Sequence, residues 1–284
     1  MPLNTRLYKT EAIILRQRRL GEADRILTVY TPARGKMQVK AKGVRKTTSR
    51  MSGHLQPLTR CLLQMAQGHV SDVVTGCETL ESFRVLREDL DRLSRAFYAA
   101  ELVDRMTAED VPGYIIYRLF LDTIRNLEQA ADPDLALRYF EMRLLDQAGF
   151  RPQLDSCVTC QTPLRPEENR STAPAGALTA GFFAPEAGGA VCRGCVPGLT
   201  GARVLSVNAL KVLRLLQRGS YKDVARVRMT ADLTREVERH LRSYVIGVLE
   251  RDVNAAAFIE KLRRDGRNME QGTGNKAGQE APCS

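Results

Sequence analysis

Two Cys-x-x-Cys pairs limit what this chain can fold into more than any other feature. The first pair is Cys157 and Cys160, and the second is Cys192 and Cys195, with 31 residues between the pairs. Each pair can place two thiolates on one ion, and together they complete a tetrahedral site. The residues from 165 to 190 are rich in Pro, Gly and Ala, which suits a segment that loops out. We predict one structural Zn²⁺ per chain, held by all four cysteines.

Other uses of the cysteines are weaker hypotheses. The N-terminus has no apolar run typical of an export signal, so metal ligation is favoured over disulfides. A redox dithiol explains one pair but not two, whereas an iron–sulfur cluster stays open because four cysteines also suit it. Catalytic zinc of the deaminase type needs His-x-Glu, and no histidine is followed by Glu two residues later. We expect Cys61 and Cys77 to be buried packing residues, and Cys283 to be inert.

Positive charge is concentrated at the start of the chain. The first 60 residues hold 14 Lys and Arg against three acidic residues, whereas the whole chain carries a formal charge of only +10. The remaining residues are therefore close to neutral. Such asymmetry indicates a polyanionic partner, either nucleic acid or an anionic membrane face.

The sequence of the same N-terminal part predicts several short strands. Five segments combine β-favouring residues with Gly or Pro at their ends, and this spacing is typical of a small barrel of the OB type. An SH3-like barrel is the alternative. The expected strands are 11–16, 24–31, 36–42, 61–67 and 71–79.

The third of these strands is the strongest candidate for ligand binding. Alternation places Met37, Val39 and Ala41 on one face, and Lys36, Gln38, Lys40 and Lys42 on the other. The polar loop from 43 to 50 follows, without acidic residues that would compensate its charge. A solvated basic strand without a ligand is the alternative interpretation. We predict nucleic-acid contacts from Arg34, Lys36, Lys40, Lys42, Arg45, Lys46 and Arg50. Tyr30 fits base stacking and core packing equally well.

A helical period replaces the strand pattern from Glu81 onward. One apolar stripe is expected to contain Phe83, Leu86, Leu90, Leu93, Phe97 and Leu102. Further helices are expected at 114–131, 133–147, 206–218, 232–250 and 254–264, with Gly149 as a C-terminal cap and Ser206 as an N-terminal cap. The predicted class is α+β. It comprises an OB-fold β-barrel at residues 1–80 and an all-α helical domain at 81–264. That domain carries the inserted four-cysteine segment at about 152–200, and a disordered tail follows at 265–284.

Nothing in the sequence indicates an enzyme. The phosphate-binding loop, the nucleophile elbow and the dinucleotide-binding turn are all missing from it. Acidic pairs such as Glu109 and Asp110 are better explained as caps or solvated faces than as metal-binding nuclease residues. Since no run approaches about 20 apolar residues, no membrane-spanning segment is expected.

Several motifs resemble the RecO family of bacterial recombination mediators. They occur in the family's order across residues 8–264, and this chain keeps all four cysteines although family members differ in that respect. The matching segments are Leu20-Gly-Glu-Ala-Asp24, Thr31-Pro-Ala-Arg-Gly-Lys36, Ala41-Lys-Gly-Val-Arg45, Tyr98-Ala-Ala-Glu-Leu102, the stretches 140–149, 152–160 and 183–189, and Cys192-Arg-Gly-Cys195.

The resemblance implies a function and a set of partners. It implies binding of single- and double-stranded DNA, annealing of complementary strands, and remodelling of single-strand-binding protein. It also implies joint action with RecR in loading RecA, a dock for the acidic tail of single-strand-binding protein on the helical domain, and a cytoplasmic, nucleoid-associated location. Two other functions fit the residues alone, namely a zinc-stabilised protein adaptor and an RNA-binding OB-fold protein.

Overall fold

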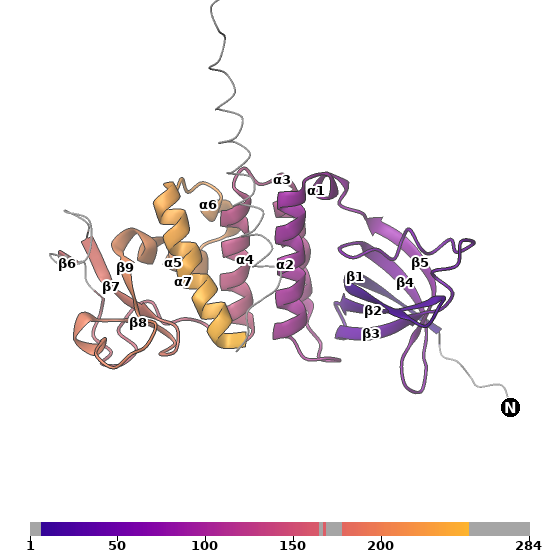
Figure 1. The fold of residues 1–284 in the computed structure, drawn as a ribbon, viewed down its shortest axis with the longest axis horizontal. Helices are drawn as coiled ribbons and strands as arrows, with labels where there is room; N and C mark the ends of the chain where they lie inside the picture. Colours follow the sequence, from indigo (N-terminus) through magenta and orange to yellow (C-terminus); the bar gives the residue numbers. More distant parts are fainter. Residues whose placement is uncertain (1–6, 165–166, 169–177, 250–284) are drawn as a thin grey trace, which may run out of the picture.

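The computed structural model describes residues 7–164, 167–168 and 178–249, and it is elongated (Figure 1). A β-barrel forms one end, a group of helices lies in the middle, and a small sheet forms the other end. The predicted helix at 254–264, the tail at 265–284 and Cys283 all lie outside the described residues.

The barrel is closed and has the strand order β1-β2-β3-β5-β4. Its strands are β1 Leu7–Leu20, β2 Asp24–Thr31, β3 Gly35–Ala41, β4 Arg60–Ala66 and β5 Val73–Glu81. All neighbours are antiparallel except β3 and β5, which pair in parallel at Lys40 and Val73. This five-stranded closure is the predicted OB-type barrel.

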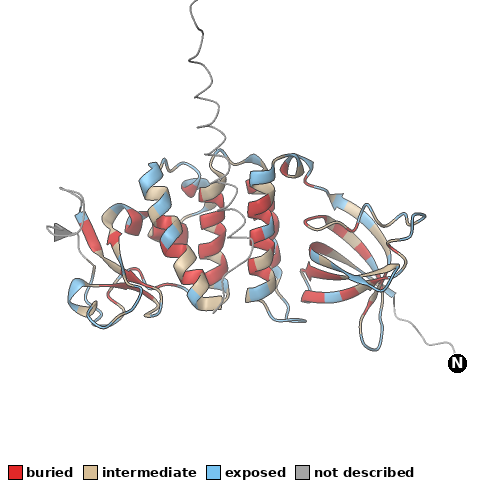
Figure 2. Cartoon of the chain, in the orientation of Figure 1, coloured by how far each residue is buried: buried red, intermediate tan, exposed pale blue. Residues whose placement is uncertain are grey.

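The interior of the barrel is filled by alternate residues of its strands, as the period of two requires. β2 contributes Leu27 and Val29, and β3 contributes Met37, Val39 and Ala41. The outward residues Ile13 of β1 and Tyr30 of β2 belong instead to the hydrophobic core of the helices. One outer face of the barrel therefore packs against the helical part, and buried residues extend from one into the other (Figure 2).

Seven α-helices are present among the described residues. They are α1 Arg84–Glu88, α2 Leu90–Met106, α3 Tyr114–Gln129, α4 Pro133–Gln147, α5 Val207–Arg218, α6 Tyr221–Val224 and α7 Ala231–Leu249. None of them has the length and hydrophobicity that a membrane span requires.

The predicted helix caps are present. Ser206 Oγ accepts the N–H of Ala209 at 3.1 Å at the start of α5. Gly149 has φ +84 and follows α4, where Phe150 N donates to Leu145 O at 2.8 Å. This left-handed glycine ends the helix in a Schellman motif.

The predicted apolar stripe of α2 is partly wrong. Leu90 is 56% exposed and Phe97 is 39% exposed, whereas Tyr98 and Leu102 are buried. α2 packs against β1, α3 and α4, so the buried face is set by those neighbours, and small residues at Ala96, Ala99 and Ala100 let them approach closely. The apolar pattern could not predict this because it does not show which elements surround a helix.

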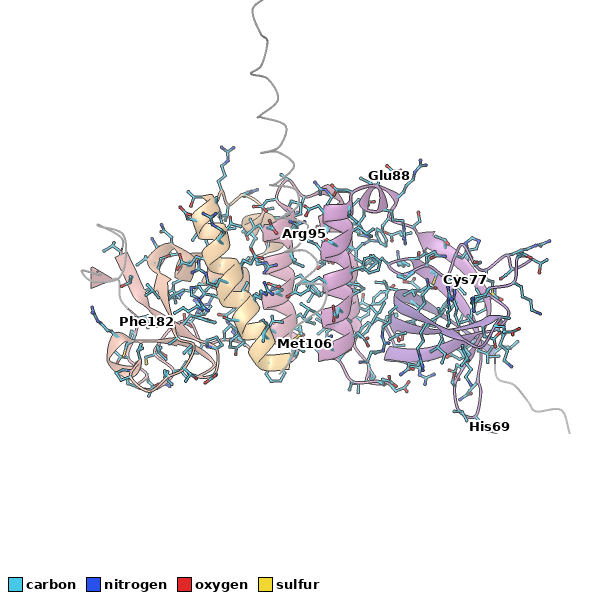
Figure 3. The ribbon with its side chains drawn as sticks, viewed as in Figure 1. His69, Cys77, Glu88, Arg95, Met106 and Phe182 are labelled. Atoms are coloured by element: carbon cyan, nitrogen blue, oxygen red, sulfur yellow. The ribbon has the colours of Figure 1, made fainter. Side chains whose placement is uncertain are left out.

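The segment around the cysteines folds as a small sheet. The sequence predicted an all-α domain here, so these strands were not expected. The sheet contains β6 Glu167–Glu168, β7 Leu178–Ala184, β8 Gly189–Val191 and β9 Arg203–Ser206, and a 3-10 turn, η1, at Arg193–Cys195. Phe183 of β7 packs on α7, with ring centroids 5.2 Å from His240 and 5.7 Å from Tyr244. Phe182 in this sheet and Cys77 on the barrel lie near opposite ends of the molecule (Figure 3).

Candidate nucleic-acid interface and metal centre

Lys36 is on the outward face of β3, as predicted, but the expected exposure of its ammonium group is wrong. The residue is only 9% exposed. Its Nζ donates to the Asp104 carbonyl and lies 3.4 Å from Asp104 Oδ1, at the C-terminal end of α2. The outward face of a strand is not the solvent face where another element packs on it.

Neighbouring polar residues of the barrel are held in the same way. Arg34 lies 3.0 Å from Asp72 and 2.7 Å from Asp110. Gln38 donates to Glu109 at 2.6 Å, and Arg16 to Asp104 at 2.6 Å. The acids at 104–110 are about seventy positions away in sequence from Arg34 and Lys36, so the predicted lack of compensating acids holds only locally.

Tyr30 packs in the core, which settles its two interpretations. It is 1% exposed, and a Cβ added at Gly113 would lie 2.2 Å from its hydroxyl oxygen. Burial raises the pKa of Tyr30 to about 12. No base can stack on this ring while the helices cover it.

The other predicted cations are differently placed. Lys42, Lys46 and Arg50 are exposed, and Lys40 and Arg45 are half-buried. Within the described ranges, none of these five has a carboxylate oxygen within 4.0 Å. Their charges are thus available to an external anion.

The structure adds three cations that the sequence patterns did not predict. Arg18 and Arg19 lie in β1, and Arg25 in β2, in the distal part of the β1–β2 hairpin. The hairpin turn contacts the 43–50 loop, because Arg45 N donates to Ala23 O at 2.9 Å and Gly43 N to Asp24 Oδ1 at 2.7 Å. The alternating side chains of β1, which ends at the turn with Gly21, could have indicated these three cations. We call the combined set the basic end: Arg18, Arg19, Arg25, Lys40, Lys42, Arg45, Lys46 and Arg50.

The basic end has the chemistry of a phosphate-binding surface. Cations that neutralise phosphates release condensed counterions, which provides affinity without reading sequence. The loop backbone is held by bonds to the hairpin, so several of these side chains start from a pre-arranged scaffold. The arrangement can bind a polyanion, and its strength should depend on salt.

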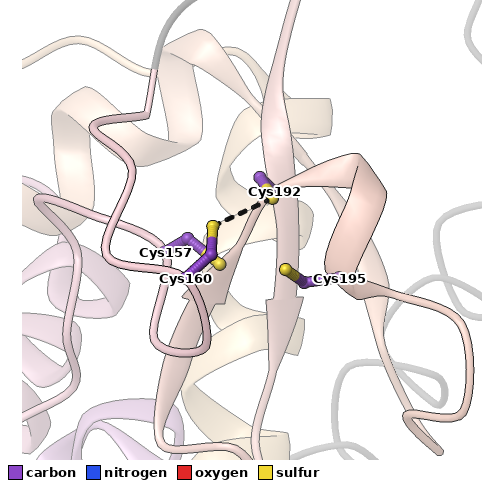
Figure 4. A group of neighbouring side chains, drawn as sticks. All are labelled: Cys157, Cys160, Cys192 and Cys195. Atoms are coloured by element: carbon purple, nitrogen blue, oxygen red, sulfur yellow. Dashed lines mark hydrogen bonds between the residues drawn. The ribbon is translucent and has the colours of Figure 1, made fainter.

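The four predicted cysteine ligands come together at the other end of the molecule (Figure 4). All four Sγ atoms lie within 4.8 Å of one another, and those of Cys160 and Cys192 are 3.6 Å apart. A tetrahedral Zn²⁺ with Zn–S bonds of about 2.3 Å requires sulfur separations of about 3.8 Å. The donor set and its spacing fit a metal ion, with no further side chain needed.

Local backbone geometry positions each pair. In the first, Gln161 N donates to Cys157 O at 2.9 Å and Cys157 N to Thr162 O at 2.9 Å, which closes a tight turn. The second follows β8, and Cys195 N donates to Cys192 O at 3.1 Å within η1. Val158 N donates to Ala190 O at 3.0 Å and ties the two turns together.

The electrostatics of the cluster also suit a cation. Although burial alone would raise it, N–H groups from Cys160, Cys192 and Thr159 lower the pKa of the Cys157 thiol to about 6. The sulfurs of Cys192 and Cys160 raise the pKa of Cys195 to about 12, because a further negative charge beside them is unfavourable. A bound cation would remove that repulsion. Outside the cluster, Cys61 is buried as predicted and Cys77 is only half-buried, and both are free thiols.

A cavity of about 890 Å³ opens among the ends of α3 and α4, the short α6 and the chain that follows α6. Its apolar lining includes Leu135, Tyr221 and Met229. Arg226 and Arg228 are exposed at its edge; Arg226 interacts electrostatically with Asp223, and Asp132 is the acidic residue of the cavity lining. The alternating pattern Arg-Val-Arg-Met at 226–229 is the signal that could have indicated such a site.

Comparison with known proteins gives consistent matches along nearly the whole chain. Residues 5–83 match the family model "Recombination protein O N terminal", and residues 87–255 match "Recombination protein O C terminal". A DNA repair protein RecO of Dehalococcoides mccartyi is 36% identical over 256 residues, covering 90% of this chain and 96% of the relative. One of a Roseiflexus species is 38% identical over 262 residues, covering 92% and 88%. One of Symbiobacterium thermophilum is 33% identical over 258 residues, covering 90% and 98%.

Proposed function

The chain belongs to the RecO family of DNA repair proteins, and from this premise we propose that it is a recombination mediator. It binds single- and double-stranded DNA, anneals complementary strands and, together with RecR, helps to load RecA onto DNA coated with single-strand-binding protein. It acts by binding rather than by catalysis, in the cytoplasm at the nucleoid. The observation that carries the proposal is the basic end of the barrel, where eight cations face solvent or line a half-buried rim without acidic partners among the described residues.

Annealing follows from that charge. Two complementary strands repel each other through their phosphates, and a cationic surface lowers this repulsion without contacting specific base edges. DNA binding is assigned to Lys40, Lys42, Arg45, Lys46 and Arg50, joined by the hairpin arginines. Arg34 and Lys36 are assigned instead to holding the barrel on the helices, since their charges are already paired with acids.

We assign Zn²⁺ to the four cysteines. Borderline-soft zinc prefers tetrahedral thiolate sites, and a four-cysteine set leaves no ligand position for water. The ion would have a structural role: it would hold the first turn against β8 and η1, so that the small sheet keeps its packing on α7.

We assign the acidic tail of single-strand-binding protein to the cavity beside α6. An acidic, partly apolar peptide needs cations at the rim and an apolar floor, and Arg226 and Arg228 with Leu135 and Met229 offer both. The cavity lies on the helical part, so a tail bound there leaves the basic end open for DNA.

The test is annealing of complementary strands precoated with single-strand-binding protein. The protein should accelerate annealing, and RecR should be required for RecA filament growth on the same coated DNA. Absence of salt-sensitive binding to a bare oligonucleotide would instead favour the adaptor function. Preference for RNA over single-stranded DNA of the same sequence would favour the RNA-binding alternative, since 2′-hydroxyl groups distinguish the two.

A further inference from the structure

The outer face of β1, β2 and β3 is divided into a covered half and an open half. The pairings Ile13↔Tyr30 and Tyr30↔Lys36 form a row that lies under the helices. The next row contains Arg16, Thr28 and Gln38, and it forms the border, because Arg16 and Gln38 bond to acids at the end of α2 and beyond it. The rows farther out have no such cover.

The open half has an apolar centre between cations. Opposed residues of paired strands point to the same face, so Arg18, Ile26 and Lys40 form one row across the three strands. Leu20 and Asp24 form the next row, with Lys42 directly after β3. Leu20 is 37% exposed, and Ile26 is half-buried and outside the hydrophobic core clusters of the described residues.

The dimensions of this face suit one strand of nucleic acid. Arg18 and Lys40 are separated by two strand spacings, or about 10 Å of sheet. A phosphate chain can follow the cations on either side while bases lie over Ile26 and Leu20. The carboxylate in this region, Asp24, accepts the N–H of Gly43 at 2.7 Å, which partly offsets its charge. Exposed Glu22 lies in the turn beyond the sheet rows.

We propose that the strip formed by Leu20 and Ile26 contacts unpaired bases, so that this face binds single-stranded DNA through bases as well as phosphates. The inference rests on the proposed DNA-binding function and adds a specificity for strand state. In a duplex the base faces are stacked inside and only groove edges are open, so the strip has nothing apolar to cover. The cations alone would bind both forms of DNA.

An abasic probe separates the two contributions. Fluorescence anisotropy at low salt compares a labelled oligothymidine of about 12 nucleotides with an abasic phosphodeoxyribose chain of equal length. The wild-type protein should bind the oligothymidine about tenfold more tightly, because the bases cover the exposed parts of two partly exposed aliphatic side chains. Equal affinities for the two probes would overturn the inference and leave charge-driven DNA binding intact.

Variants locate the effect. Leu20→Ser and Ile26→Ser should each weaken oligothymidine binding about threefold without changing affinity for the abasic chain. Lys40→Gln with Lys42→Gln should lower the affinity for the oligothymidine and for the abasic chain by the same factor. Leu80→Ser is the matched control, because Leu80 is 38% exposed on β5. It should change neither affinity.

Folding of the variants and binding by the wild type are measured as controls. Ile26 is half-buried, so urea unfolding is measured for its variant, whereas Leu20 is more exposed at the hairpin end and its variant tests the strip with less effect on folding. An unchanged ratio of the two affinities in Leu20→Ser would overturn the role of the strip. Failure of the wild type to bind either probe at low salt would overturn the proposed DNA-binding function itself, and the two failures are thereby distinguishable.

Discussion

The ammonium group of Lys36 lies 3.4 Å from the carboxylate of Asp104, where β3 of the barrel meets the end of α2. Arg16 approaches the same carboxylate at 2.6 Å from β1. One acid of the helical part therefore holds two strands of the barrel. Together with the shared core at Ile13 and Tyr30, these contacts make the barrel and the helices a continuous structure at this junction.

The first prediction concerns this junction. Asp104→Asn leaves the ammonium group of Lys36 nearly buried without its charge partner, and should lower the free energy of unfolding by about 2 kcal/mol. Urea denaturation measures the loss. The double variant Lys36→Met with Asp104→Asn should recover part of it, because no unpaired charge stays buried. DNA affinity of the double variant should equal that of the wild type; a marked drop would mean that Lys36 contacts DNA.

The second prediction concerns salt dependence. Replacing Lys40, Lys42, Arg45 and Lys46 by Gln should reduce the slope of log affinity against log salt by about 3 for single-stranded DNA, since each phosphate contact contributes about 0.7. Titrations at several salt concentrations give the slope. The matched control neutralises four exposed cations on the helices, at Lys211, Lys222, Arg235 and Arg239. If both quadruple variants show the same slope, the basic end is not the DNA site.

The third prediction concerns the cysteine cluster. Cys157→Ser with Cys160→Ser should release the metal, which we expect to be one Zn²⁺ per chain, and lower the melting temperature, because metal binding contributes to folding. Elemental analysis of purified protein measures the stoichiometry. Cys77→Ser should keep the full metal content, since Cys77 lies in the barrel. Wild-type protein without stoichiometric metal would refute the assignment.

The fourth prediction concerns acid stability. Arg125, followed by Arg60, lowers the pKa of Glu81 below its ordinary value of 4.5, and Arg60 likewise lowers that of Glu11. Because these pKa values are lower in the folded state, the stability they contribute is present above about pH 4.5 and is lost as pH falls through the folded values. The melting temperature should drop in that window. Glu81→Gln should make the drop shallower, and an identical pH profile would argue against this contribution.

The fifth prediction concerns the cavity beside α6. Arg226→Glu with Arg228→Glu should weaken binding of an acidic tail peptide of single-strand-binding protein at least about tenfold, because charge-assisted bonds are lost and repulsion replaces them. Isothermal titration with the peptide measures the change. Lys211→Glu with Arg239→Glu reverses the same amount of charge on α5 and α7, outside the cavity lining. Equal loss in both variants would show that only overall charge matters.

Local patterns predicted much of the architecture because they depend on neighbours in the chain. β2 spans Asp24–Thr31 and α4 spans Pro133–Gln147, both as expected. The caps at Ser206 and Gly149 act within a few residues, so their chemistry is visible in sequence. The four cysteines were identified for the same reason, since metal-ligand spacing is a property of each short turn.

The less accurate expectations depended on contacts between distant segments. The strand period placed Lys36 on the outward face of β3, but only the docking of α2 decides that this position is buried beside Asp104. The exposed side of α2 at Leu90 and Phe97 likewise follows from the elements that surround it. The small sheet around the cysteines joins β7 and β9 across about twenty residues, and its short strands carry too little periodicity to predict.

By itself, the sequence determined the strand and helix periods, the cysteine spacing, the charge surplus and the family motifs, because each is encoded in adjacent residues. Only the tertiary structure decided which of the N-terminal cations have no acidic partner and can therefore bind an anionic ligand. Arg16, Arg34 and Lys36 are paired with acids that folding brings to them, whereas Lys40 to Arg50 are joined by Arg18, Arg19 and Arg25 across the hairpin. A charge is available only where no opposite charge folds against it, and that depends on the path of the whole chain.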